Sequence, residues 1–182
     1  AKNYADVTME QIAERSGLTK GALYHHFSSK EELYLHMMHA GLARMRALFS
    51  AALASSGGCR RRLGRLTQAF LELPPDQIGL MRLVRRDVNI FAAPARGKLV
   101  RSYQEALPAV VEAAIRDGMR DGELIKADPR LLAWNFVAMV EVTLGRYPDS
   151  VLKNSRAKLD YVLDLFFLGA ATPRPTGRRT IP

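Results

Sequence analysis

The stretch VTMEQIAERSGLTKGALYHHFSSKEEL, residues 7–33, combines three helix-start signals with a glycine break. Thr8, followed three residues later by Gln11, forms a capping box, which predicts that a helix begins at Met9. Gly17 tolerates a positive φ and predicts the end of this helix after barely two turns. The run therefore begins with a very short capped helix.

A second short helix is predicted directly after the first. Leu18 is expected to act as an apolar plug between the two helices, and Thr19 is expected to be the N-cap of a helix that begins at Lys20. Leu23 and Phe27 are four residues apart, so they form the buried stripe of this helix. Its remaining residues are left for other faces.

A second capping box, Ser29 with Glu32, predicts a long helix from Lys30. Helices of two turns are not stable by themselves and must be held by packing. A helix-turn-helix gives a reason for their shortness, because eight residues rise roughly 12 Å and the DNA major groove is about 12 Å wide. An ordinary helical hairpin with an exposed Tyr-His-His cluster is the alternative that the spacing leaves open.

The outward residues of this motif suit DNA. Gly21 and Ala22 keep the start of the second helix slim, which lets its backbone approach bases and phosphates. Lys20 can donate to guanine or phosphate, and the Tyr24 hydroxyl can reach a phosphate. The other candidates lie at helix N-termini, where backbone amides favour phosphates, and are Thr8 and Lys30.

The pattern T-x-x-x-I-A-x-x-S-G-L-T-K-G-A-L-Y-H-H-F-x-S-K-E-E-L, which runs from Thr8 to Leu33, resembles the DNA-binding motif of the TetR/AcrR family of transcriptional regulators. The resemblance is close over this stretch and extends to the rest of the chain only in its helical character. It implies that the second short helix is the recognition helix. The DNA contacts that it implies are Thr8, Thr19, Lys20, Gly21, Ala22, Tyr24, His25, His26 and Lys30, with Tyr24 and Lys30 matching phosphate contacts best.

The sequence departs from the family at its start. Family members begin with a helix that packs against the other two, whereas here only AKNYAD precedes Val7. That helix is either absent from the protein or lies before Ala1, and the lack of an initiator methionine favours the second expectation.

The net charge of +9 does not come from the motif. Residues 1–50 carry six basic and five acidic side chains, a net charge of +1, and the remaining residues carry +8. The case for DNA binding therefore rests on geometry rather than on bulk charge. No apolar run approaches the roughly 20 residues that span a bilayer, no secretory leader is visible, and the single cysteine, Cys59, suits a reducing compartment. We expect a cytoplasmic protein with no membrane partner.

The fold class is predicted as all-α, because proline and glycine interrupt a sequence otherwise rich in helix formers. Pro108 is expected to bend the sixth helix. The predicted organisation is a helix-turn-helix domain with its connecting helix at 1–50, a regulatory domain at 51–171, and a basic, Pro-rich, disordered tail at 172–182. Helices are expected at 8–16, 19–27, 30–54, 59–73, 76–91, 95–121, 129–146 and 151–170.

The last two predicted helices, 129–146 and 151–170, are apolar on most of their surface. A helix that is apolar all round is buried all round, and two adjacent ones in so small a chain suggest that a partner covers some faces. We expect a homodimer through a four-helix bundle, which the resemblance also implies, with two core helices of a monomer as the alternative. A two-fold dimer predicts a pseudo-palindromic operator with recognition helices about 34–36 Å apart.

The resemblance also implies a cavity for a small-molecule effector in the regulatory domain. Asn135 and Glu141 need polar partners on an apolar helix, and Arg82, Arg85 and Arg86 are expected to form a solvated face. The candidate lining residues, which would equally suit a plain core, are Phe70, Met81, Phe91, Tyr103, Trp134, Asn135 and Met139.

Other chemistry finds little support in the sequence. His36 and His39 lack further ligands at metal-binding spacing and are expected to be exposed helix residues. Arg60, Arg61 and Arg62 could lower the pKa of Cys59 for a redox role, but no second cysteine is present to resolve an oxidised form. No phosphate-binding loop, nucleophile elbow or catalytic triad pattern occurs. We therefore expect no cofactor, no metal and no enzymatic activity.

These signals together predict a ligand-responsive, dimeric transcriptional regulator. It is expected to act as a repressor that leaves double-stranded operator DNA when a small apolar or amphipathic effector binds, and to be nucleoid-associated while bound to DNA. Two alternatives remain from other classes, a helical protein-interaction adaptor and a small enzyme, each with a non-functional helix-turn-helix.

Overall fold

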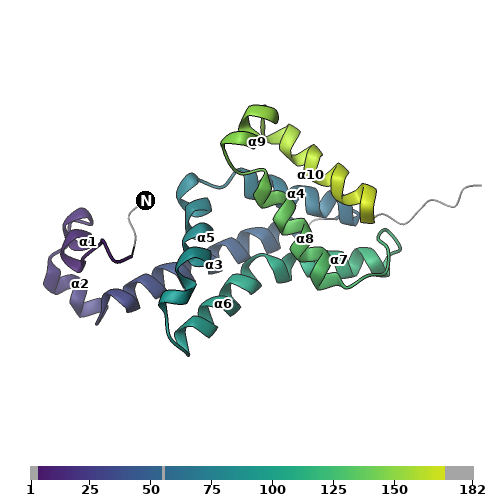
Figure 1. The fold of residues 1–182 in the computed structure, drawn as a ribbon. Coiled ribbons are helices and arrows are strands. Elements are labelled where there is room, and N and C mark those ends of the chain that lie inside the picture. The colour runs from purple at the N-terminus through teal and green to yellow at the C-terminus, as the bar shows by residue number, and fades with distance from the viewer. Residues whose placement is uncertain (1–3, 55, 171–182) are drawn as a thin grey trace, which may run out of the picture. The chain divides into compact units, whose positions relative to one another are not determined.

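The computed structural model describes residues 4–54 and 56–170, and the regular structure in these ranges is helical (Figure 1). The all-α fold class predicted from the sequence is confirmed. Among the described residues, no helix has both the length and the apolar character needed to cross a membrane. The helices in these ranges are α1 (Met9–Arg15), α2 (Lys20–His26), α3 (Lys30–Leu53), α4 (Cys59–Leu71), α5 (Pro75–Asp87), the 3-10 helix η1 (Val88–Ile90), α6 (Ala95–Ala106), α7 (Pro108–Arg120), α8 (Pro129–Val142), α9 (Arg146–Val151) and α10 (Ser155–Ala170).

Several predicted helices are wrong in extent. The helix expected at 129–146 ends at Val142, and the separate short helix α9 was not expected. The single bent helix expected at 95–121 is two helices, because Pro108 occupies the first position of α7 and the preceding Leu107 is not helical, with φ −137° and ψ −58°. Proline suits the first turn, where its missing N–H leaves no hydrogen bond unmade. The helix expected at 151–170 begins instead at Ser155, after Asn154 accepts a 2.9 Å hydrogen bond from the Ala157 N–H.

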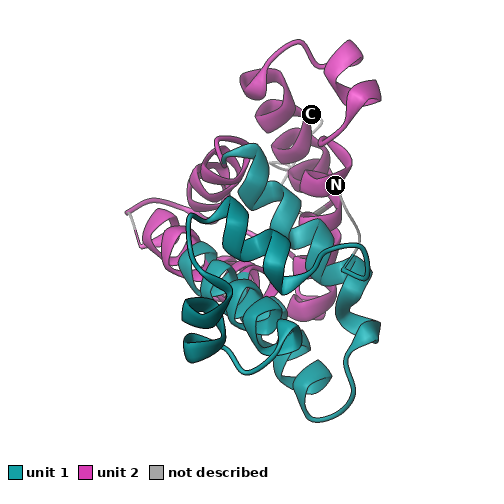
Figure 2. Cartoon of the chain, turned by 90° about the vertical axis from the view of Figure 1, so that its left-hand side faces the viewer, with its two compact units in different colours: residues 1–45, 74–106 teal, residues 46–73, 107–182 magenta. Residues whose placement is uncertain are grey.

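The contacts divide the chain into two compact units (Figure 2). The first combines residues 1–45 with 74–106, and therefore holds α1, α2, most of α3, α5, η1 and α6. The second combines residues 46–73 with 107–182 and holds the end of α3 together with α4, α7, α8, α9 and α10. The boundary expected near residue 50 stays a prediction, and the expected tail at 172–182 lies outside the described residues.

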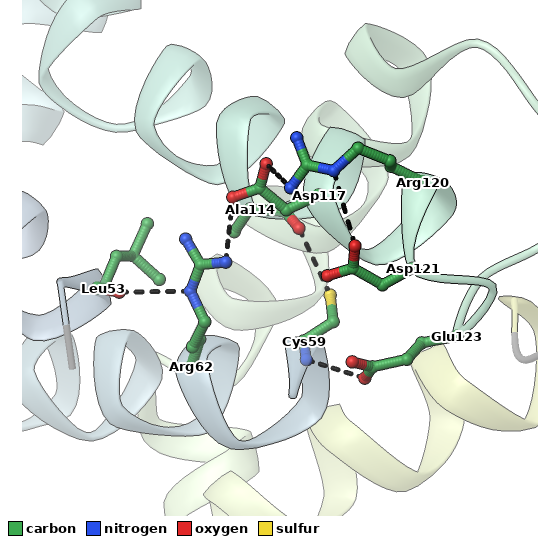
Figure 3. Close-up of polar contacts among 8 residues, drawn as sticks. All are labelled: Leu53, Cys59, Arg62, Ala114, Asp117, Arg120, Asp121 and Glu123. Carbon is green, nitrogen blue, oxygen red and sulfur yellow. Dashed lines mark hydrogen bonds and ion pairs between the residues drawn. The ribbon is translucent and has the colours of Figure 1, made fainter. Parts of the chain in front are cut away.

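Within the second unit, α4 packs against both α7 and α10. Figure 3 shows how polar groups hold the start of α4. Arg62 donates to the Leu53 carbonyl at 3.1 Å and to the Asp117 carboxylate at 2.9 Å, and the Cys59 N–H donates to Glu123 at 2.7 Å. The Glu123 carboxylate thus satisfies a free N–H at the start of α4, although it comes from a distant part of the sequence.

Candidate nucleic-acid interface

The first short helix has the capped start that the sequence predicts. Thr8 Oγ1 accepts from the Gln11 N–H at 3.2 Å, and the Gln11 side chain accepts from the Thr8 N–H at 3.1 Å, so both halves of the capping box are present. Gly17 takes φ 67° directly after the helix. Leu18, the expected plug, instead leaves 47% of its surface exposed, and its N–H donates to the Ala13 carbonyl at 2.9 Å. The expected apolar role of Leu18 is therefore wrong.

The second short helix turns one face inward and one outward. Thr19 Oγ1 accepts from the Ala22 N–H at 3.1 Å, as an N-cap should. Leu23 joins Met9 and Ala13 in a small core, and Phe27 packs against that core from the end of the helix. The inward stripe predicted from the sequence is confirmed. The exposed residues on and before this helix are Thr19, Lys20, Gly21, Tyr24, His25 and His26, with Ala22 half-buried.

Gly21 has no role in packing this motif. A Cβ placed on it would meet nothing closer than Thr19 Oγ1 at 4.0 Å. Its backbone does not adopt a positive φ either. The fold would therefore accept alanine at this position.

Lys20 forms an ion pair with Glu10 of α1, and its ammonium lies 5.9 Å from the centre of the Tyr24 ring. The hydrogen bond between the two side chains raises the pKa of Lys20 and lowers that of Glu10. Both side chains are more than half exposed, so the pair orients the lysine more than it stabilises the fold. The local sequence around Glu10 gives no sign of this pair, since the two partners lie on different helices.

Lys30 is not free at the start of α3. Its ammonium donates to the main-chain carbonyls of Tyr4 and Val7, both at 3.0 Å, and lies 4.3 Å from the centre of the Tyr4 ring. The side chain is half-buried in this position. The sequence assigned Lys30 to DNA through its place at a helix N-terminus and did not foresee these internal acceptors.

The capping box expected before α3 is half correct. Ser29 Oγ accepts from the Glu32 N–H at 3.1 Å, as predicted. The Glu32 carboxylate, however, accepts from the N–H and hydroxyl of Ser28, at 2.8 and 2.6 Å, rather than from the Ser29 N–H. These bonds lower the pKa of Glu32.

A buried carboxylate links α5 to α3 within the first unit. Asp87 is 3% exposed, and it accepts from the Tyr34 hydroxyl at 2.6 Å and from Arg86 at 2.5 and 2.7 Å. The Arg86 guanidinium lowers the pKa of Asp87, and burial followed by the bond to Asp87 raises that of Tyr34. Arg82, Arg85 and Arg86 are all exposed, as expected, and Arg86 in addition donates to the buried Asp87.

The candidate effector residues are distributed over both units. Met81, Phe91 and Tyr103 are buried in the first unit. In the second, Phe70 is buried beside Phe49 with ring centres 5.9 Å apart, and Trp134 is half-buried. The remaining two candidates, Asn135 and Met139, line an open apolar groove. The effector pocket stays a prediction.

This groove lies between α8 and α10. Val142 is 67% exposed and Leu165 is 46% exposed, whereas the opposite faces of the same helices bury Phe136, Val137 and Val162. Leu168 on α10 is 86% exposed. The two helices are therefore apolar on a face that the described residues leave uncovered. The residues lining the groove are Leu132, Asn135, Ala138, Met139, Val142, Tyr161, Leu165, Phe166 and Gly169.

The weaker sequence signals are also corrected. Cys59 is buried, and burial followed by the Glu123 charge raises its pKa to about 12, so the thiolate needed for a redox role is disfavoured despite Arg62 nearby. His39 is half-buried rather than exposed, with its Nδ1 2.8 Å from Ser102 Oγ, and burial lowers its pKa. His36 is exposed as expected.

Comparisons with known proteins agree on one family. Residues 1–37 match the model described as bacterial regulatory proteins, tetR family. The probable HTH-type transcriptional regulator ArpR of Pseudomonas putida is 31% identical over 188 residues, covering 93% of this chain and 86% of ArpR. The HTH-type transcriptional activator FasR of Mycolicibacterium smegmatis is 28% identical over 146 residues, covering 80% of this chain and 64% of FasR.

The fold is shared with solved structures as well. The TetR family transcriptional regulator PfmR from Thermus thermophilus gives a TM-score of 0.73 at 22% identity, covering 94% of this chain and 92% of PfmR. This likeness concerns the arrangement of the helices.

Proposed function

Because the chain belongs to the TetR family of bacterial transcriptional regulators, we propose that it represses transcription as a homodimer and leaves its operator when a small effector binds. The observation that carries the proposal is the outward face of α2. Its polar residues and Gly21 stay exposed while Leu23 is held in the core. Packing within the chain gives no reason for a glycine at position 21 on that face.

The proposed DNA contacts follow from this exposure. Lys20 and Tyr24 would reach phosphates or base edges from the start and middle of α2, and His25 and His26 would follow from its last turn. The main chain at Gly21 would approach the DNA closely, flanked by Thr19 and Ala22. Thr8 would place the N-terminus of α1 against a phosphate. Lys30 is proposed as a further phosphate contact from the start of α3, through the ammonium N–H that does not bond to the Tyr4 and Val7 carbonyls.

Dimerisation is proposed to bury the apolar groove between α8 and α10. A second copy presents the same face, so a two-fold axis would bring the exposed Val142 and Leu165 of both chains into a four-helix bundle. Such a dimer would read a pseudo-palindrome with half-sites about 34–36 Å apart. The protein would act in the cytoplasm, at the nucleoid when bound to DNA.

The effector is proposed to work by population shift. The two DNA-binding heads of the dimer have one spacing that fits the operator and another that does not. The effector must bind more tightly to the spacing that does not fit, since equal affinity for both would change nothing. The candidate residues are apolar and aromatic with the amide of Asn135, which suits a small apolar or amphipathic molecule. Repression is proposed as the outcome. Activation, the role named for the relative FasR, is the opposite outcome.

Selection of genomic DNA fragments at near-physiological salt tests the proposal. The full-length protein is expected to enrich a palindrome, which the Lys20→Ala/Tyr24→Ala variant is expected to lose. Both side chains are exposed, so this variant should remain folded. If a folded dimer enriched no sequence, the motif would not be a working DNA-binding head. The result would then support the interpretations of the protein as an adaptor or an enzyme.

The Gly21→Ala variant tests the close approach of α2 to DNA separately from the stability of the fold. We expect the free energy of unfolding to stay constant or to rise by up to about 1 kcal/mol, because alanine lowers the entropy of the unfolded chain and the site has room. Operator affinity should nevertheless fall roughly tenfold, equivalent to about 1.4 kcal/mol, as the added methyl group meets the DNA. Urea unfolding and fluorescence anisotropy measure the two effects. Unchanged affinity would show that this part of α2 stays away from the DNA.

A further inference from the structure

One face of α8 is an apolar stripe interrupted by a single amide. Leu132, Asn135, Met139 and Val142 follow one another at intervals of three, four and three residues, and all four line the groove between α8 and α10. These are the intervals of the seam positions in paired helices, where each side chain packs between residues of the partner helix. We call these four residues the α8 seam. Their spacing indicates a face that packs on another helix.

The groove offers the Asn135 amide few hydrogen-bond partners. Of the residues that line it in the described part of the chain, only Asn135 and Tyr161 have a polar atom in their side chains. Both residues are exposed in the single chain, so water can bond to them. A partner that covered the groove would remove this water, and an amide buried without a hydrogen bond is unfavourable. Whatever covers the groove must therefore supply a donor or an acceptor at Asn135.

A second copy of this chain supplies both. The asparagine side chain combines an NH₂ donor with a carbonyl acceptor. In an interface with two-fold symmetry, a residue close to the axis meets its own copy, and every contact occurs twice. Two asparagines that face each other across the axis can therefore exchange two N–H···O hydrogen bonds without any other polar group. Asn135 lies halfway along α8 (Pro129–Val142), and Ala138, three residues further along, is exposed and small enough to let two helices approach closely.

We propose that Asn135 determines which chain this protein pairs with, through reciprocal hydrogen bonds between its amide and the same amide in a second copy. This inference rests on the proposed function, because it concerns the proposed dimer. A different apolar helix pair that fitted the groove would leave the amide buried and unpaired, so it would bind more weakly. Asparagine at a seam position of a coiled coil likewise lowers stability and specifies the pairing. In this role the amide faces the second copy rather than the effector.

The test mixes isotope-labelled wild type with unlabelled Asn135→Leu in equal amounts, well above both dissociation constants, and counts the dimers by native mass spectrometry. Random mixing gives twice as many mixed dimers as dimers of either kind alone. A mixed dimer would bury one amide against a leucine, so we expect its share relative to the two homodimers to be about tenfold below the random value. The Asn135→Leu homodimer buries no amide, and its dissociation constant should be roughly tenfold lower than that of the wild type.

The share of mixed dimers responds to contacts between the two copies of one position. If the Tyr161 hydroxyl of the second copy bound the amide instead, each mixed dimer would keep one of two such bonds, and mixing with Asn135→Leu would be random. Met139→Leu is the matched control, because it changes another residue of the α8 seam and keeps it apolar. It should mix randomly with wild type. Random mixing of Asn135→Leu would overturn the proposal.

Opposite charges at position 135 give a second, independent readout. Asn135→Asp and Asn135→Lys would each place two like charges together in a homodimer, so each variant alone should be monomeric by sedimentation. The two variants mixed should form a dimer, because the charges are then opposite. Stable dimers of either variant alone would place position 135 away from its copy, and would contradict the proposal. Two variants that stayed monomeric when mixed would do the same.

Sedimentation of the wild-type protein keeps this inference separate from the proposed function. A wild-type chain that stayed monomeric would refute the proposed dimer, and the pairing of the amides with it. A wild-type dimer that mixed randomly with Asn135→Leu would refute the pairing of the amides alone, and the proposed dimer would stand. Asn135 is exposed in the single chain, so its replacement should leave the fold of each chain intact.

Discussion

Leu165→Glu is expected to yield a monomer that keeps its helices and loses operator affinity by about 10²- to 10⁴-fold. Leu165 is 46% exposed in the groove between α8 and α10. In the proposed dimer its carboxylate would be buried beside an apolar face and near its own symmetry copy, which carries a large cost. The loss of affinity follows because one head no longer binds at the high effective concentration supplied by the other. Sedimentation and operator titration measure the two effects.

A matched control distinguishes the groove from the surface in general. Ile125 lies between α7 and α8, is 38% exposed, and is not among the residues that line the groove. Ile125→Glu introduces the same charge at a similar exposure. It should leave the mass of the dimer in solution and the operator affinity unchanged. A proven Leu165→Glu monomer with wild-type operator affinity would contradict the proposed role of the dimer.

Asp87→Ala is expected to reduce the free energy of unfolding at pH 7 by about 2–3 kcal/mol. It leaves the half-buried Tyr34 hydroxyl and the Arg86 guanidinium without their acceptor. Breaking a fully buried ion pair costs about 3–5 kcal/mol, and the effect here should be smaller because the Arg86 side chain keeps 41% exposure. Urea unfolding of both proteins measures the difference.

The same comparison at low pH tests the role of charge. The pKa of Asp87 is lowered in the folded protein, chiefly by Arg86. Its stabilisation is therefore fully present above the unfolded value of about 3.9 and is lost as the pH falls through the folded value. The difference between wild type and Asp87→Ala should be constant from about pH 5 to 8 and should shrink below about pH 4. A difference that did not change with pH would assign the effect to packing alone.

Asp87 also shows where prediction from local sequence reaches its limit. In the run MRLVRRDV, residues 81–88, all three arginines are exposed as expected, but nothing in the local pattern indicates that Arg86 also donates to a buried Asp87. The hydroxyl that donates to Asp87 belongs to Tyr34, 53 residues earlier in the chain. Nothing in the local pattern at either position indicates the other.

The interpretation of Cys59 from its neighbours in the sequence fails for a similar reason. The three arginines that follow it predict a lowered thiol pKa when only neighbours in the sequence are considered. In the folded chain the thiol is 2% exposed and its Sγ lies 3.5 Å from the Ala114 carbonyl, with Glu123 adding a negative charge nearby. Burial outweighs the adjacent positive charges, because desolvation of the thiolate acts whatever the local sequence.

The sequence by itself determined the features whose physics is local. The caps at Thr8 and Thr19, the positive φ of Gly17 and the inward Leu23 all depend on residues within four positions of one another, so spacing alone specifies them. The tertiary structure decided which partner each charge has. Lys20 and Lys30 look equivalent in sequence, yet the carbonyls that hold Lys30 lie 23 and 26 residues away. Such acceptors are brought to the ammonium only when apolar burial has folded the chain, because long-range contacts follow from packing rather than from local backbone preference.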